Sequence, residues 1–176
     1  MAAEALADAG RSVLVVDAKP SPARKLLMAG KSGLNLTKSE PLNAFLAHYG
    51  NAALPLTPML TAFGPAEIQA WAQGLGQELF TGSTGRVFPK SMKASPLLRA
   101  WLARLAGKGV TLQTRTRWTG WAQGGCQMAT PDGTVILHPR VTVLACGGAS
   151  WARLGSDGAW ASWINAETSP ATWANR

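Results

Sequence analysis

The first seventeen residues constrain the fold more than any other part of the chain. Residues 1–9 are rich in alanine, which favours a helix, and Gly10 is suited to end it. Residues 12–16 form a short run of mostly β-branched side chains, and Asp17 follows directly. A helix, a tight turn and a strand ending in an acid follow the glycine-rich turn of a dinucleotide-binding βαβ unit, where the acid accepts hydrogen bonds from ribose hydroxyls. This order predicts an α/β fold.

Composition indicates a globular chain. The 176 residues are 47% apolar, enough for one sizeable core. No run of about 18 uncharged apolar residues is present, so we expect no membrane span, and the acids near the N-terminus are not typical of a signal peptide. The chain has only two cysteines, Cys126 and Cys146. This low number favours a reducing, cytoplasmic setting.

The net charge of +8 has two interpretations. The seventeen Lys and Arg residues are spread along the chain without a run of five, which favours solvated charge and a phosphate site over a nucleic-acid surface. The alternative hypothesis is a basic nucleic-acid-binding module, with Arg115, Arg117 and Arg140 forming its positive face.

The pattern of apolar residues and turn residues predicts mixed helices and strands. Helices are expected at 23–28, 41–48, 56–63, from Pro65 onward and from Ser95-Pro96 onward. Strands are expected at 110–116, near 126–130 and 134–137, and at 141–145, where the apolar run predicts a fully buried strand. The turn at 131–133 joins two of these strands as a hairpin. This order favours an α/β sheet with a β-meander.

The sequence lacks several motifs that would indicate other functions. Gly30-Lys31-Ser32 looks like the end of a P-loop, but Lys25 stands where that motif needs a glycine. His48 and His138 lie far apart, and no metal-ligand cluster or hydrolase elbow is found. The small residues at Gly147 and Gly148 allow a ligand to approach the backbone closely, with a simple tight turn as the alternative interpretation.

The chain resembles the BaiN-like (HI-type) NAD(P)/FAD-dependent flavoproteins, and is most similar to the uncharacterised bacterial branch of that family. The resemblance extends over about residues 1–160. It is carried by residues 1–17, 24–37, 85–94 and 143–151. It implies a partial Rossmann-like FAD-binding domain with a helical insertion and a β-meander, and an FAD-dependent oxidoreductase linked to NAD(P)H with an unidentified small-molecule substrate.

The resemblance also implies which residues meet FAD. Asp17 would hold the adenosine ribose, and the loop at 30–37 would run along the cofactor toward the flavin. Cations and backbone N–H groups suit the pyrophosphate. The implied cofactor-binding set is Asp17, Arg24 and Lys25 near ribose and pyrophosphate, Gly33, Leu34 and Asn35 in the loop, the backbone near Trp118 at the adenine, and Ala145, Gly147 and Gly148 beside the pyrophosphate. No catalytic acid, base or nucleophile stands out.

The resemblance divides the chain and predicts a fragment. Residues 1–40 are expected to be part of the FAD-binding domain, 41–95 a helical insertion, 96–160 the continuation of the FAD-binding domain and 161–176 an atypical tail. Residues 1–176 contain no G-x-G-x-x-G turn, and the family's C-terminal half is also expected beyond this sequence. We therefore expect this chain alone to hold FAD poorly or not at all, and an inactive truncated product is a third hypothesis.

Overall fold

The computed structural model describes residues 1–148, 152–155 and 157–164. The chain forms two compact units, unit 1 from Met1–Lys25 with Leu105–Arg176 and unit 2 from Leu26–Arg104. Of the predicted tail at 161–176, residues 165–176 lie outside the described residues, as do residues 149–151, which carry part of the family resemblance. The division into domains at residues 40, 95 and 160 stays a prediction.

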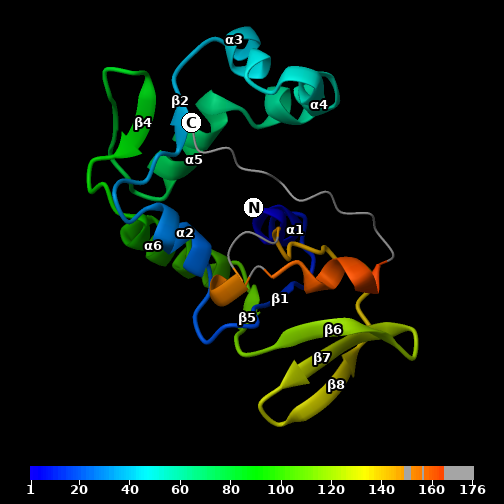
Figure 1. Cartoon of the computed structure of the whole chain (residues 1–176). Helices are drawn as coiled ribbons and strands as arrows, with labels where there is room; N and C mark the ends of the chain where they lie inside the picture. The colour runs from blue at the N-terminus through cyan, green and yellow to red at the C-terminus, as the bar shows by residue number, and fades with distance from the viewer. Residues whose placement is uncertain (149–151, 156, 165–176) are drawn as a thin grey trace. The chain divides into compact units, whose positions relative to one another are not determined.

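The expected helix, turn and strand open unit 1 (Figure 1). Helix α1 (Ala2–Asp8) is followed by Gly10, whose φ of 70° suits a helix end. Strand β1 (Leu14–Val16) then pairs in parallel with β5 (Thr111–Gln113). The N–H of Asp17 donates to the carbonyl of Gln113 at 3.0 Å and continues the ladder. The parallel pair confirms the α/β class, and Asp17 lies at the carboxyl end of β1.

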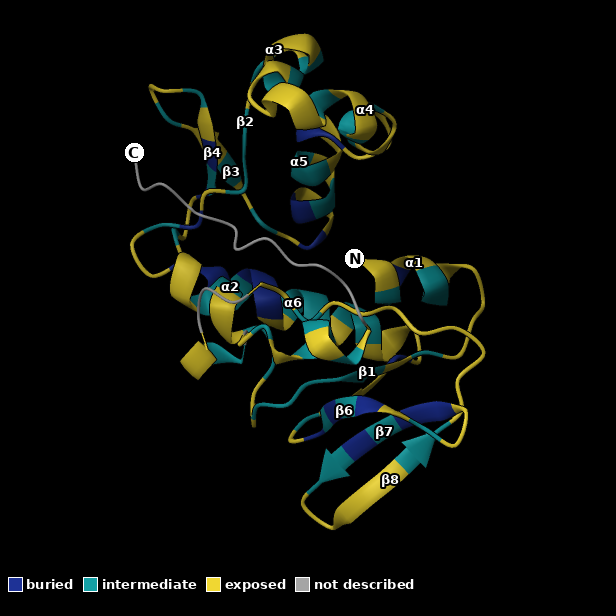
Figure 2. Cartoon of the chain, turned by 45° about the vertical axis from the view of Figure 1, so that its right-hand side comes forward, coloured by how far each residue is buried: buried dark blue, intermediate teal, exposed yellow. Residues whose placement is uncertain are grey.

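The rest of the unit 1 sheet structure is a β-meander of β6 (Arg117–Ala122), β7 (Gly125–Thr130) and β8 (Gly133–Leu137). The hairpin between β7 and β8 confirms the prediction from the turn residues. Strand β6 was not predicted from the sequence. The turn after it has positive φ at Gln123 and Gly124, as tight hairpins require. Figure 2 shows β7 largely buried and β8 largely exposed.

The prediction of a buried strand at 141–145 is wrong. The structure gives this segment no strand, and Val141 and Val143 are 74% and 55% exposed. A strand needs a neighbour with free backbone groups, and no described strand pairs with residues 141–145. An apolar, β-branched run favours extended backbone, but it forms a strand only where a partner strand lies beside it.

Unit 2 is mostly helical, and it contains the helices predicted near 41–48, near 56–63 and from Pro65 onward. Its core contains Leu34, Ala72, Leu75, Ala94 and Leu97, and Trp71 meets Trp101 edge-on at 4.9 Å beside it. Both tryptophans therefore pack against this core, where they are partly buried. The elements of unit 2 are most of α2 (Arg24–Ala29), β2 (Thr37–Lys38), α3 (Leu42–Ala47), the 3-10 helix η1 (Gly50–Ala52), α4 (Ala53–Ala62), α5 (Pro65–Gly74), β3 (Leu79–Thr81), β4 (Arg86–Pro89) and most of α6 (Ala94–Gly107). The first two residues of α2 and the last three of α6 belong to unit 1.

The beginning of α5 shows how the sequence sets a boundary in unit 2. The N–H of Gly64 donates to Glu67 Oε2 at 2.9 Å, and Pro65 occupies the first helical position, where no N–H is needed.

Strands β2, β4 and β3 form an antiparallel sheet in that order. Among the described residues, no helix combines the length and apolar character required to cross a membrane.

Candidate functional site

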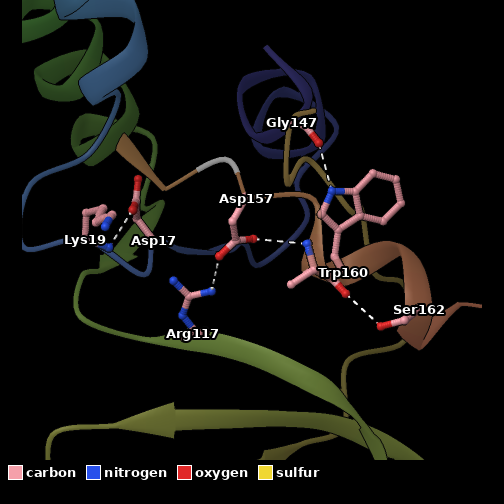
Figure 3. A network of polar contacts seen from close by, with 8 residues as sticks. Asp17, Lys19, Arg117, Gly147, Asp157, Trp160 and Ser162 are labelled. Atoms are coloured by element: carbon pink, nitrogen blue, oxygen red, sulfur yellow. Dashed lines mark hydrogen bonds and ion pairs between the residues drawn. The ribbon is translucent and has the colours of Figure 1, made fainter. Parts of the chain in front are cut away.

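Asp17 is held at the end of β1 by its backbone on both sides. Its N–H donates to Gln113, and its carbonyl accepts from the N–H of Thr116 at 3.0 Å. Its Oδ1 accepts from the N–H of Lys19 at 2.8 Å (Figure 3). Oδ2 has no hydrogen-bond partner within the described part of the chain, and the residue is half-buried. The fixed carboxylate can therefore accept a hydrogen bond from a hydroxyl group.

The backbone at Gly147 and Gly148 is exposed. Gly147 has a φ of 74°, in the left-handed region that favours glycine. A Cβ added at Gly148 would meet no atom within 4 Å, so the backbone can be approached closely. The carbonyl of Gly147 accepts from Trp160 Nε1 at 2.8 Å (Figure 3). Ala145, just before this turn, is also exposed.

A short 3-10 helix, η3 (Ala159–Trp163), carries Trp160 and is tied to β6 by Asp157. The carboxylate of Asp157 accepts from the Ala159 N–H at 3.1 Å and from Arg117 Nη1 at 3.2 Å. The Ala159 N–H, and then Arg117, lower the pKa of Asp157. Burial, together with the charge of Asp157, raises the pKa of the Cys146 thiol, which favours its uncharged form.

Trp118 is 8% exposed and lies in the unit 1 core with Cys126 and Met128. Its ring meets those of Trp121 and Trp163 edge-on, each at 5.2 Å between centroids. Its Nε1 is buried, and the described residues supply no hydrogen-bond partner for it. The side chain therefore packs inside the unit, which leaves the backbone of β6 for any ligand contact at this position.

The glycine loop of unit 2 packs against the residues that precede α6. The N–H of Leu34 donates to the carbonyl of Met92 at 3.1 Å, and a Cβ at Gly33 would lie 2.6 Å from Met92 Cε. Leu34 is buried in the core, whereas Asn35 is exposed. Of these three residues, Asn35 has the side chain that is most accessible to a ligand.

The structure groups part of the expected site in unit 1. Arg24 and Lys25, at the start of α2, are exposed. Sequence reasoning missed Trp160, Asp157 and the ion pair of Arg117, because side chains so far apart in the sequence leave no local pattern. The expected residues within unit 1 are Asp17, Arg24, Lys25, Trp118, Ala145, Gly147 and Gly148, whereas Gly33, Leu34 and Asn35 belong to unit 2.

Comparison with known proteins identifies the class. The family model described as the HI0933-like protein Rossmann domain matches residues 1–171, and the chain belongs to this family. The fold is therefore a partial Rossmann-like α/β fold with a helical insertion and a β-meander.

One curated relative is a 3-dehydro-bile acid delta(4,6)-reductase from Clostridium scindens. It is 32% identical over 160 residues, which cover 89% of this chain and 37% of the relative. The chain thus spans little more than a third of the length of this relative.

Proposed function

We propose that this chain supplies part of the FAD site of a flavin-dependent oxidoreductase that takes electrons from NAD(P)H and acts on a small molecule. Membership of a Rossmann-domain family and similarity to a protein named as a reductase support the proposal. Its two cysteines, both free, suit a reducing compartment, so we place the protein in the cytoplasm.

The observation that carries the proposal is the position of Asp17. It follows a parallel strand, its backbone is fixed, and Oδ2 has no partner within the described ranges. An acid at this place in a dinucleotide-binding unit accepts hydrogen bonds from ribose hydroxyls. The chemistry of this side chain fits the adenosine half of FAD.

The other proposed contacts follow the chemistry of each group. Exposed Arg24 and Lys25 would stabilise the negative charge of the pyrophosphate, and the exposed glycine backbone at Gly147 and Gly148 would allow its close approach. Ala145 precedes this turn, and the backbone near Trp118 is proposed to meet the adenine. Gly33, Leu34 and Asn35 are proposed to follow the cofactor toward the flavin. Bound flavin supplies the electron-transfer chemistry, and the protein binds and orients it.

The test is FAD binding by the full-length protein, that is, the complete gene product that includes residues 1–176, with Asp17→Asn. The complete product is used because residues 1–176 alone are expected to hold FAD poorly. The substitution keeps the size of the side chain and removes the charge that strengthens hydrogen bonds from hydroxyls. Loss of such bonds predicts an affinity for FAD lower by about tenfold or more. Titration with FAD, followed by gel filtration and a flavin absorption spectrum, measures it.

Asp8→Asn is the matched control. It makes the same change of charge, but Asp8 pairs with Lys108 and lies on α1. We expect this variant to bind FAD as the unsubstituted protein does. A full-length protein that retains no FAD, or an Asp17→Asn variant with unchanged affinity, contradicts the proposal.

The electron donor is tested separately. Anaerobic addition of NADH or NADPH to the FAD-loaded protein is expected to bleach the oxidised flavin spectrum, and no bleaching with either would remove NAD(P)H from the proposal.

The nucleic-acid module stays an alternative prediction, although Arg117 pairs with Asp157 and its charge is balanced locally. A salt-sensitive shift of labelled DNA or RNA tests that alternative.

A further inference from the structure

We propose that Trp160 is a positioning residue that holds the Gly147–Gly148 backbone in the conformation that receives the pyrophosphate of FAD. This inference rests on the proposed function and adds to it a residue that sequence patterns do not mark. Its starting observation is the hydrogen bond from Trp160 Nε1 to the Gly147 carbonyl, 2.8 Å long (Figure 3).

The segment before Gly147 needs such support. Within the described ranges, no backbone–backbone hydrogen bond joins residues 141–147 to another part of the chain. A contact of 3.3 Å between Thr142 Oγ1 and Cys126 Sγ holds the beginning of the segment. At its other end Gly147 adopts a φ of 74°, one of several conformations open to a glycine. The bond from Trp160 therefore selects one backbone conformation at this end.

Trp160 can do this because its own helix is held at both ends. Before it, Asp157 accepts from the Ala159 N–H and from Arg117 on β6. After it, Trp163 packs edge-on against Trp118 and contacts the position of Gly120. Gly120 lies at the bulge of β6 with a φ of 122°, where a side chain would be strained. The two anchors fix the direction of the Trp160 indole N–H.

A backbone that is already held in its binding conformation loses less conformational freedom when the ligand binds. The bond from Trp160 fixes the Gly147 carbonyl and with it the peptide plane that follows Gly147. A fixed plane at this exposed turn determines how closely a phosphate group can approach the backbone. Trp160 therefore acts through Gly147 and Gly148 and needs no contact of its own with FAD.

The experiment compares Trp160→Phe with Trp121→Phe in the full-length protein. Both substitutions keep an aromatic ring, but only the first removes the donor to Gly147, and Trp121 is half-exposed on β6. We expect Trp160→Phe to weaken FAD binding about three- to tenfold, the size of one lost hydrogen bond, and Trp121→Phe to stay within about twofold. Trp160→His, which restores a ring N–H, is expected to recover part of the affinity.

A second measurement does not depend on the cofactor. Hydrogen exchange of the cofactor-free protein is expected to be faster at residues 146–148 in Trp160→Phe and unchanged there in Trp121→Phe. Equal losses of affinity in both variants would indicate general loosening and overturn the inference.

The outcomes separate the two proposals. If the unsubstituted protein binds FAD and Trp160→Phe binds it equally well, the positioning role is wrong and the proposed function stands. If the unsubstituted protein does not bind FAD, the proposed function fails, and the role of Trp160 toward pyrophosphate fails with it.

Discussion

Two segments of unit 1 have similar sequences and different structures. Residues 12–17 and 141–148 are both apolar, β-branched runs that lead into proposed cofactor residues. The first forms β1, in a parallel ladder with β5. The second has no ladder, and its described polar contacts come from Cys126 and Trp160. Thus one side of the proposed site is fixed by strand pairing and the other by side chains.

The difference shows that an apolar run favours extended backbone, and that the presence of a neighbouring strand decides whether it forms a β-strand. Val16 packs against the unit 1 core, whereas Val143 is more than half exposed. Strand preference measures how well side chains pack against strands beside them, so the same residues behave differently without a partner. Substitutions at matched positions in the two segments should therefore have unequal effects.

The largest difference is expected from proline. Val15→Pro removes an N–H within the β1–β5 pair and should lower the free energy of unfolding by about 2–3 kcal/mol. Val143→Pro lies outside any described ladder and should cost less than about 1 kcal/mol. Urea unfolding of both variants measures these values. Equal destabilisation would mean that residues 141–148 are paired as strongly as β1.

Alanine at the two neighbouring glycines gives a smaller difference. Gly147→Ala places a Cβ on backbone with a φ of 74° and should destabilise the cofactor-free protein by about 1 kcal/mol. Gly148 lies outside the left-handed region and has open space around its position, so Gly148→Ala should be close to neutral. Thermal unfolding without FAD compares the two. Identical midpoints would show that the Gly147 conformation is not maintained in solution.

The smallest effect concerns Asp157, whose pKa is lowered in the folded protein from its usual 3.8. A lowered carboxyl pKa adds stability above the unfolded value, and that stability is lost as the pH falls through the folded value. The side chain is partly exposed, so solvent limits the contribution to about 0.5 kcal/mol or less. Asp157→Asn should therefore be less stable than the unsubstituted protein at about pH 6, and the difference should be smaller at about pH 3, below the usual value.

Urea unfolding at the two pH values checks this prediction. Ser162→Ala is a suitable control, because it removes a hydroxyl bond to the Ala159 carbonyl within the same segment and carries no charge. Its effect should not depend on pH. A difference between Asp157→Asn and the unsubstituted protein that persists undiminished at low pH would contradict the assigned cause.

The sequence predicted local features well and pairing less well. The helix, turn and strand before Asp17 and the hairpin at 131–133 depend on residues close in sequence, and both predictions are confirmed. The strand at 141–145 depends on a neighbour that no local pattern reveals, and that prediction is wrong. Strand β6 was missed although Trp118 and Gly120 are buried on it, because its bulge interrupts the alternation.

The candidate site follows the same rule. The position of Asp17 at the end of a strand could be predicted, because it depends on the residues directly before it. Trp160 could not, since its contact with Gly147 spans thirteen residues and depends on the position of η3 beside the meander. Trp118 was assigned to the site through its backbone, and only the structure shows its side chain in the core.

The central claim is that the Asp17 carboxylate binds the ribose of a dinucleotide. A crystal structure of the full-length protein with FAD tests it most directly. We expect a carboxylate oxygen of Asp17 about 3 Å or less from an adenosine ribose hydroxyl. A bound FAD whose ribose lies elsewhere, with Asp17 facing no cofactor atom, would contradict the claim.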